Sequence, residues 1–478
     1  MHWLRFSLLA VAALLLGGAE PPSALPRGWH CLVKLTDGPH AQANVSLTFP
    51  APTTPQVCAD MPSAGRFVRD IQQIFSDGRA LPLVRDGDCF RLIDAKAVPV
   101  RLRYKYDLAA AADHFNNADL VQRHEQAMTF SEEAVLLRPD PLPLPDSPSL
   151  PSPSIDVEFE LPTGTALTVP WQKLPGPGLR YQLDAAQYDG GSYVTFGAVR
   201  PLGTLALAHS QVELHLVGKS RASDLELRTW IEQASRASER LYGPQMPSNV
   251  HIVIVAWPGQ TELGSFGTVL RPLRPSVLIY FGADATRFPL SDDWVATHEI
   301  FHIGNPLMRY KVPWFVEGFT TYYQDILRAR LGALTAKEAW SDLWDGFRRH
   351  CQPNGTSLET ESANLHKTYR YTRVYWGGAC LAFLLDVEIR KKSQGKRSLD
   401  DVMRSLRKQS LHTRLDEESV LEGLGQASSP ALVRRYLRER NALPLRETLT
   451  LLGIEPVGDD SVRLRDDAPL SALRRAMF

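Results

Sequence analysis

The pattern of apolar and polar positions in the first third of the chain is that of short β-strands. Residues 78–108 carry brief β-branched and apolar runs broken by Asp-Gly turns, which favour hairpins. A more helical pattern interrupts the strands at residues 108–128, and strand patterns resume after the following proline-rich stretch. We therefore predict an N-terminal β-rich domain over residues 20–138 that continues over residues 155–205.

A different pattern follows the β-rich domain. A run of apolar residues at helical spacing begins after Ser223, the candidate N-cap, and stops at Gly243. Two continuous apolar runs, residues 249–259 and 275–284, are dense in Val and Ile and predict buried strands. We expect these elements to form an α/β unit over residues 206–330.

The remainder of the chain is mostly helical in pattern, to about Gly453. Residues 377–392 are an example, with mostly apolar side chains and a basic end. We expect a helical lobe over residues 331–457, followed by a C-terminal tail over residues 458–478. Together with the β-rich and α/β parts, this predicts a multidomain α+β fold.

Composition separates these parts and narrows their partners. Residues 139–154 are rich in Pro and Ser and cannot form a packed core, which predicts a linker or long exposed loop. The chain has 478 residues and equal numbers of basic and acidic side chains, 53 each. A formal charge of zero does not favour nucleic acid or an anionic membrane as the main partner.

The N-terminus has the pattern of a secretory signal. Arg5 precedes an apolar run at residues 6–16, and small residues follow, ending at Ala19. The run is too short to span a bilayer comfortably, and the remaining chain has no longer one. We predict a signal peptide over residues 1–19, export to the periplasm or the extracellular space, and no stable membrane insertion after its removal.

Five cysteines are compatible with an exported protein that forms disulfides. Cys351 with Cys380 is one plausible bridge, and one pair among Cys31, Cys58 and Cys89 is another. The odd number leaves one free thiol. The spacing shows no C-x-x-C pair, so a cysteine-ligated zinc is not supported.

The candidate chemistry centres on the sequence HEIFH at residues 298–302. On an α-helix, His298 and His302 lie on one face and can offer two imidazoles to one metal ion. Glu299 lies beside the first histidine, where it can reach a metal-activated water without ligating the metal. The alternative is a helix whose histidines are satisfied core residues, because five letters can arise by accident.

A catalytic zinc needs a third protein ligand in addition to the two histidines. Glu317 lies in the stretch VPWFVEGFTTYY, which opens a second helix after a turn at Pro313. A carboxylate at this position can complete a His, His, Glu set. By itself, Glu317 could also be a solvated glutamate that favours a helix start.

These segments resemble the gluzincin metallopeptidases, in particular the glycyl-aminopeptidase family, whose catalytic domain is related to those of aminopeptidase N and thermolysin. The match is closest in "HEIFHIGNP…VPWFVEGFTTYY" and in "RVYWGGACLAFLLDVEIRKKSQGKRSLDDVMRSL", and it extends more loosely from Val98 to Val457. The resemblance implies one Zn²⁺ per chain on His298, His302 and Glu317, with Glu299 as the general base. It also implies a thermolysin-like catalytic domain, with residues 206–330 as its α/β part, that acts on peptides or proteins.

The resemblance also implies a tyrosine whose hydroxyl stabilises the oxyanion of the reaction. In the superfamily this tyrosine lies three residues before a glycine, which assigns the role to Tyr375 with Gly378. Tyr371 is the competing candidate and is also a candidate substrate contact, and both tyrosines could instead be packing residues. Upstream, Gly267 belongs to a glycine-containing strand that a peptide can approach, which makes Gly267 a candidate substrate contact.

The sequence therefore predicts an exported zinc metallopeptidase, a hydrolase of the aminopeptidase-like class. The alternative is a catalytically weak or inactive peptidase-like module that serves as a binding or scaffold protein of the cell envelope. That alternative is motivated by two departures from the family pattern. The strand around Gly267 lacks the glutamate with which relatives bind a substrate amino terminus, and Gly377 stands where relatives have a lysine.

Overall fold

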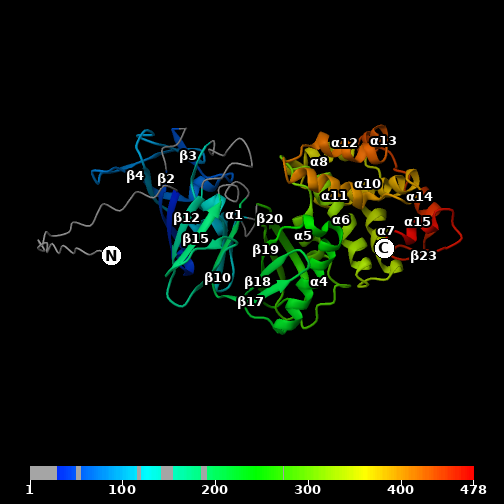
Figure 1. Cartoon of the computed structure of the whole chain (residues 1–478), viewed down its shortest axis with the longest axis horizontal. Coiled ribbons are helices and arrows are strands. Elements are labelled where there is room, and N and C mark those ends of the chain that lie inside the picture. Colours follow the sequence, from blue (N-terminus) through cyan, green and yellow to red (C-terminus); the bar gives the residue numbers. More distant parts are fainter. Residues whose placement is uncertain (1–28, 50–54, 116–119, 141–153, 185–190, 273) are drawn as a thin grey trace, which may run out of the picture.

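The computed structural model describes residues 29–49, 55–115, 120–140, 154–184, 191–272 and 274–478. It confirms the multidomain α+β prediction. Figure 1 shows a β-rich part (blue to cyan), a central sheet with its helices (green), and a lobe made mostly of helices (yellow to red) that follow one another along the long axis. The predicted signal peptide and residues 141–153 of the predicted linker lie outside the described residues.

The β-rich part contains three sheets around one apolar core. The largest has the order β14-β15-β12-β1-β2-β8-β4-β5. Its strands are β1 (Trp29–Leu35), β2 (Gln42–Phe49), β4 (Val68–Ile74), β5 (Ala80–Pro82), β8 (Val100–Asp107), β12 (Ser154–Glu160), β14 (Gln172–Lys173) and β15 (Leu179–Asp184). Strand β1 alternates buried and more accessible positions, which is the period-2 pattern of a sheet with one face on the core.

Two four-stranded sheets complete this part, in the orders β13-β16-β10-β9 and β11-β3-β7-β6. Their strands are β3 (Gln56–Cys58), β6 (Val84–Asp86), β7 (Cys89–Arg91), β9 (Val121–Arg123), β10 (Ala127–Ser131), β11 (Arg138–Pro139), β13 (Ala166–Thr168) and β16 (Tyr193–Gly197). The short helices are α1 (Leu108–Phe115), α2 (Glu132–Val135) and the 3₁₀ turns η1 (Gly38–His40) and η2 (Ala64–Phe67).

The helical pattern predicted at residues 108–128 is only partly correct. Helix α1 covers its first eight residues, but the pattern's second half contributes to β9 and β10. Every residue of β10 is buried, and the strand pairs on both sides, with β9 and β16. Pairing within a buried sheet therefore overrides the local helical preference of this segment.

The central unit is a five-stranded sheet of order β17-β18-β19-β21-β20. Its strands are β17 (Val199–Ala206), β18 (Gln211–Val217), β19 (Asn249–Trp257), β20 (Gly264–Leu270) and β21 (Ser276–Gly282), and its helices are α4 (Asp224–Tyr242) and α5 (Val295–Gly304), with η3 (Gly243–Gln245) after α4. Strands β18, β19 and β21 are parallel, whereas β20 runs antiparallel to β21 at the edge. Ser223 caps α4 through a capping box with Glu226, and Gly243 ends it, as predicted.

The C-terminal lobe packs its helices on one continuous core with the central sheet. Its elements are α6 (Pro313–Arg330), α7 (Ala336–His350), α8 (Leu358–Ala363), α9 (Leu365–Thr368), α10 (Tyr371–Lys392), α11 (Leu399–Ser410), α12 (Glu417–Ala427), α13 (Pro430–Arg438), α14 (Leu445–Leu452), β22 (Ile454–Pro456), β23 (Val462–Leu464) and α15 (Ser471–Arg475). Residues 458–478, which the sequence analysis set apart as a tail, contribute β23 and α15, and Met477 is fully buried.

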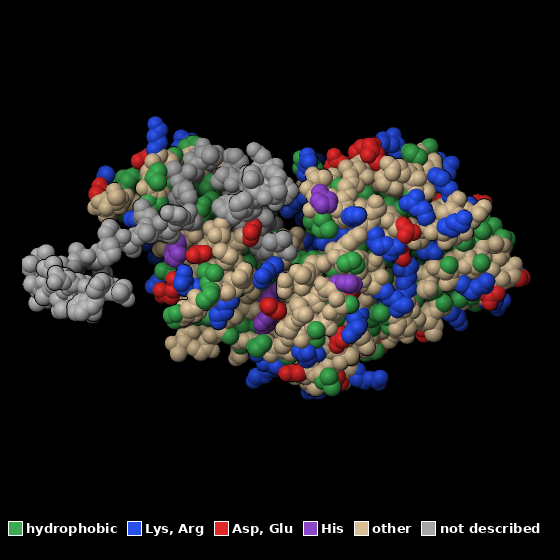
Figure 2. All heavy atoms as spheres, viewed as in Figure 1, with side chains coloured by type: hydrophobic (Ala, Val, Ile, Leu, Met, Phe, Trp, Pro, Cys, Tyr) green, Lys and Arg blue, Asp and Glu red, His purple; other side chains and the backbone are tan. Residues whose placement is uncertain are grey.

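The disulfides agree with the sequence predictions. Cys351 bonds to Cys380, and Cys58 bonds to Cys89 across paired strands, which leaves Cys31 as a buried free thiol. Basic and acidic side chains lie interspersed over the visible face in Figure 2. In the part of the chain that the structure describes, no helix is both long and apolar enough to cross a bilayer.

Candidate metal and catalytic site

The site is built on α5, whose start is fixed by Asp293. The Asp293 carboxylate accepts hydrogen bonds from the backbone N–H groups of Val295 (2.9 Å) and Ala296 (3.3 Å), which satisfies two donors of the helix start. It also accepts from the indole of Trp230 on α4 at 2.6 Å. This buried carboxylate therefore joins α5 to α4 and sets where the HEIFH segment begins.

Close packing also fixes the other end of α5. A Cβ built on Gly304 would lie only 2.1 Å from the ring of Tyr242 on α4, so a side chain at this position is excluded. The Tyr242 hydroxyl donates to the side-chain oxygen of Asn305 at 2.9 Å. The glycine after the second histidine thus has a structural reason, which is the close approach of two helices.

The structure brings His298, His302 and Glu317 together. The Nε2 atoms of His298 and His302 lie 3.5 Å and 3.3 Å from Oε2 of Glu317, and the three ligand atoms are all within 4.8 Å of one another. A tetrahedral zinc with ligand bonds of about 2.0–2.1 Å requires ligand atoms separated by roughly 3.3 Å. Two imidazoles and one carboxylate at these separations fit a catalytic zinc.

The tautomer of His302 is set by its neighbours. The hydroxyl of Thr320 donates its one proton to the carbonyl of Val316 at 2.6 Å, so toward the Nδ1 of His302, at 3.4 Å, it can only accept. Asn305 donates to the same hydroxyl at 2.8 Å and holds it in place. The contact with the Thr320 hydroxyl matches a proton on Nδ1 of His302, which leaves the lone pair of Nε2 for the candidate metal position, although the amide nitrogen of Asn305 also lies 3.4 Å from Nδ1.

His298 has an equivalent partner on α6. Its Nδ1 lies 2.9 Å from the side-chain oxygen of Gln324, which accepts the imidazole proton. This arrangement again leaves Nε2 as the metal-facing nitrogen. Gln324 comes seven residues after Glu317, two helical turns on, so one face of α6 supplies both a candidate ligand and the group that orients another.

The three side chains are strongly coupled electrostatically. Burial opposes charge on Glu317, but the two adjacent histidines outweigh it and hold the pKa of Glu317 well below its usual range. Burial alone would lower the pKa of His298, yet hydrogen bonding to Glu317 and the charge of Glu299 raise it. Burial lowers the pKa of His302. Glu317 is therefore an ionised carboxylate, as a zinc ligand must be.

Glycines allow the helix that carries Glu317 to meet α10. Pro313 begins α6, as the sequence predicted, and Glu317 follows in the next turn. A Cβ on Gly318 would lie 2.4 Å from the Cα of Gly378, and a Cβ on Gly378 would lie 2.1 Å from the carbonyl oxygen of Trp314. The two glycines face each other where α6 and α10 cross, which brings Tyr375 toward Glu317.

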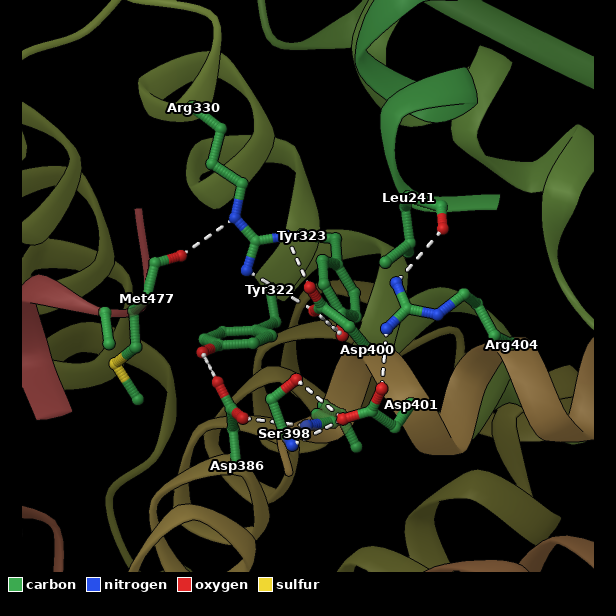
Figure 3. A network of polar contacts seen from close by, with 12 residues as sticks. Leu241, Tyr322, Tyr323, Arg330, Asp386, Ser398, Asp400, Asp401, Arg404 and Met477 are labelled. Carbon is green, nitrogen blue, oxygen red and sulfur yellow. Dashed lines mark hydrogen bonds and ion pairs between the residues drawn. The ribbon is translucent and has the colours of Figure 1, made fainter. Parts of the chain in front are cut away.

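A buried polar network holds the far half of α6 (Figure 3). Tyr322 donates to Asp386 at 3.0 Å and Tyr323 donates to Asp400 at 2.8 Å. Arg330, at the end of α6, pairs with Asp400 at 2.8 Å and donates to the carbonyl of Met477 at 2.8 Å. α10, α11 and the chain end therefore all bond to α6, the helix that carries Glu317.

The predicted catalytic residues surround the three candidate ligands. Tyr375 stacks on His298 with ring centroids 6.2 Å apart, and burial together with the charges of Glu317 and Glu299 raises its pKa. Tyr371 lies one turn away, 6.3 Å from Tyr375, and is 48% exposed. Tyr375 is thus the tyrosine in contact with the candidate site, whereas Tyr371 lies at its rim.

Gly267 lies directly against the candidate base. A Cβ on Gly267 would lie 2.3 Å from Cγ of Glu299, so the missing side chain is what lets β20 approach α5. Among the described residues, β20 pairs with β21 alone, so no described strand pairs with its other edge. An open strand edge can pair with an extended peptide.

Sequence reasoning did not assign roles to Gln324, Thr320 or Trp294. Helical spacing from Glu317 could have pointed to the first two, because positions three and seven residues later share its face. Trp294, 48% exposed, packs its ring edge-on against His298 at 5.6 Å, and four-residue spacing could have revealed that contact. The glutamate with which relatives bind the amino terminus of a substrate has no counterpart on β20.

Comparisons with known proteins agree with this geometry. The family model described as M61 glycyl aminopeptidase matches residues 305–376, a segment that contains Glu317, Tyr371 and Tyr375. A search of curated proteins found no significant match.

Solved structures show where else this fold occurs. An aminopeptidase N family protein from Idiomarina loihiensis superposes with a TM-score of 0.71 at 17% identity, covering 91% of this chain and 80% of that chain. An M1 zinc metallopeptidase from Deinococcus radiodurans superposes with a TM-score of 0.53 at 16% identity, covering 88% of this chain and 96% of that chain. Yeast LTA4 hydrolase superposes with a TM-score of 0.54 at 14% identity, covering 89% of this chain and 72% of that chain.

At these identities the superpositions establish the fold, and the family model ties the Glu317 segment to glycyl aminopeptidases. The resemblance to gluzincin aminopeptidases that the sequence indicated is therefore confirmed. The comparisons support a zinc metallopeptidase with a zinc cofactor.

Proposed function

We propose that the protein is an exported zinc metallopeptidase in which Glu299 is the general base and Tyr375 the oxyanion donor. The observation that carries the proposal is the convergence of Nε2 of His298, Nε2 of His302 and Oε2 of Glu317 within zinc-binding separations. Gln324 and Thr320 orient the two imidazoles for the same position. A helix with incidental histidines has no reason to show both features.

The reaction divides between the metal and the side chains of this chain. When bound, zinc supplies Lewis acidity to the scissile carbonyl and lowers the pKa of the attacking water. Glu299 takes a proton from that water as the new C–O bond forms, and it gives the proton to the leaving amine as the C–N bond breaks. Its side chain lies against Gly267, on the face of β20 that packs on α5.

Tyr375 is suited to stabilise the negative charge that develops on the carbonyl oxygen. Its raised pKa keeps the phenol protonated at neutral pH, so the hydroxyl can donate a hydrogen bond. Donors of this type contribute on the order of 3 kcal/mol to the transition state. The packing of Tyr375 on His298 holds the ring beside the reacting centre.

The substrate proposed here is a peptide bound in extended form along β20. Backbone groups on the open edge supply sequence-independent pairing, as in other complexes that add a strand to a sheet. A mutant of the Deinococcus radiodurans protein has been solved with a Tyr-Ser-Ala substrate bound. That protein shares this fold, which favours short peptides as the first substrates to test.

Export is proposed from the N-terminal pattern and from the cysteines. A positive residue, an apolar run and small residues within positions 1–19 form a signal-like segment. Two disulfides among the described residues suit an oxidising compartment. We assign the protein to the periplasm or the extracellular space.

The test combines metal analysis with one substitution. The purified protein should contain one zinc per chain and should hydrolyse short peptides, and a chelator should abolish this activity. Glu299→Gln should retain the zinc and lower kcat by about 10²–10⁴-fold, because it removes a general base. Zinc far below one per chain, or equal activity in the variant, contradicts the proposal.

A further inference from the structure

Arg271 follows directly after β20 and points along the face of α5. From Gly267 onward the pairing of β20 with β21 is regular, so alternate residues share a face. Gly267 meets Glu299 on α5, and Thr268 points the other way to the hydroxyl of Tyr193. Arg271 therefore lies on the same side as Gly267, four residues along, which is roughly 13 Å of extended strand.

The Arg271 side chain turns toward the end of α5 that carries His302. Its Nη1 donates to the backbone carbonyl of His302 at 2.9 Å and to that of Asn305 at 3.4 Å. The guanidinium thus lies beside the second candidate zinc ligand, at one end of the surface between α5 and β20. The Coulombic attraction of Glu317 also reaches it.

Arg271 has an unbalanced charge at this position. Arg407 donates to the same carbonyl of Asn305 at 3.1 Å and to the carbonyl of Gln245 at 3.2 Å. Within the described parts of the chain, neither guanidinium forms an ion pair with a carboxylate. Burial and the neighbouring Arg407 lower the pKa of Arg271 to about 10, so Arg271 remains charged at neutral pH.

Three N–H donors of Arg271 are available. Both protons of Nη1 are directed at carbonyls, whereas Nε and Nη2 have no hydrogen-bond partner among the described residues. Among the described residues, some side-chain atoms are shielded from solvent and also lack a hydrogen-bond partner, such as Nε of Arg328. No atom of Arg271 belongs to this group. Arg271 is partly exposed, and its remaining donors are not among the fully enclosed atoms. A guanidinium edge of this kind matches the two oxygens of a carboxylate.

We propose that Arg271 is a substrate-binding residue that recognises a carboxylate of the peptide at the end of the α5–β20 surface next to His302. The proposal rests on the zinc-peptidase function and names its substrate class. The carboxylate is either the side chain of an Asp or Glu near the scissile bond or the free C-terminus of a short peptide. Both sources present the same planar anion to the same donors.

A purely structural role is the competing explanation, because arginines often bond to the last carbonyls of a helix. Arg407 provides the matched control. It caps the same carbonyl of Asn305 but is only 3% exposed. If capping were the whole role, Arg271→Gln and Arg407→Gln should both lower stability, and neither should change the preference among substrates.

Kinetics on paired peptides separate these roles. One set of pairs differs as Asp against Asn at each position within four residues of the scissile bond, and another pair differs as a free C-terminus against an amide. We expect the wild type to prefer one acidic member, and Arg271→Gln to lower kcat/KM for that member by about 10–100-fold while changing its neutral partner little. Arg407→Gln should leave the preference unchanged. Equal losses on both members, or no acidic preference in the wild type, would overturn the proposal.

A binding measurement distinguishes this proposal from the proposed function. Calorimetry with zinc-loaded Glu299→Gln and the same peptide pairs reports carboxylate recognition without turnover. Tighter binding of the acidic member, lost in Glu299→Gln/Arg271→Gln, supports the carboxylate site even if the wild type cleaves no peptide. If the wild type cleaves peptides but binds the acidic and neutral members equally, the peptidase function stands and the proposed role of Arg271 is rejected. The pair that shows the effect identifies the source of the carboxylate.

Discussion

Gly378→Ala tests whether the crossing of α6 and α10 positions the catalytic tyrosine. The new Cβ would lie 2.1 Å from the carbonyl oxygen of Trp314 and 2.7 Å from the Cα of Gly318. Both neighbours are backbone atoms, so the two helices must separate by about 1 Å to reach ordinary contact. Overpacking of this kind costs about 1–3 kcal/mol in free energy of unfolding. The displacement carries Tyr375, one turn earlier on α10, away from the candidate site.

Gly377→Ala is the control on the same helix. Its Cβ would meet chiefly a methyl group of Leu358, at 2.9 Å, which is the end of a flexible side chain. Replacing a helical glycine by alanine gains about 0.5–1 kcal/mol when no clash occurs. Gly377→Ala should therefore leave the free energy of unfolding unchanged or slightly raised.

Urea unfolding and steady-state kinetics measure the two consequences. A misplacement of about 1 Å can cost on the order of 10²-fold in rate, so Gly378→Ala should lower kcat by 10–100-fold while zinc content stays near the wild type. Gly377→Ala should retain most of the activity. If Gly378→Ala is as stable and as active as Gly377→Ala, the helix crossing does not position Tyr375 in the way described.

Three further predictions address other parts of the structure. Gln324→Leu removes the acceptor of His298 and should weaken zinc binding by about 10–100-fold in a chelator competition, whereas unchanged affinity would rule out the orienting role. Burial lowers the pKa of His251 to about 3, below the ordinary 6.5, so the unfolded chain takes up a proton between these pH values. The free energy of unfolding should therefore fall from pH 6.5 toward pH 4 by up to about 1.4 kcal/mol per pH unit. Urea unfolding of His251→Asn should show a smaller decrease over the same pH range. Cys380→Ser opens the bridge to Cys351 and should lower the free energy of unfolding by about 2–4 kcal/mol, measured against the wild type with and without reductant.

The sequence predicted most strongly the features that repeat with a helical or strand period. Ser223 and Gly243 bound α4 as expected, and HEIFH lies on a helix with both histidines on one face. Glu317 follows Pro313 at the start of α6, and the structure brings it to the histidines. These features depend on local backbone geometry, which a short segment encodes by itself.

Features that depend on distant contacts were missed or only partly predicted. Residues 121–128 belong to a segment with a helical pattern but contribute to strands β9 and β10, because β10 pairs within a buried sheet with β9 on one side and β16 on the other. The role of Gly378 becomes visible only when α10 crosses α6, and that of Gly304 only when α5 packs on Tyr242. Arg271 carries no motif, and its position beside His302 follows from the alternation of β20 against α5. Such contacts join residues that lie far apart in the sequence.

The central claim is that one zinc ion is held by His298, His302 and Glu317. A crystal structure of the zinc-loaded protein, with anomalous data collected at the zinc absorption edge, tests it most directly. The account predicts one peak per chain, within about 2.0–2.2 Å of Nε2 of both histidines and of a carboxylate oxygen of Glu317. A site without a peak, or a zinc bound by other residues, would contradict it.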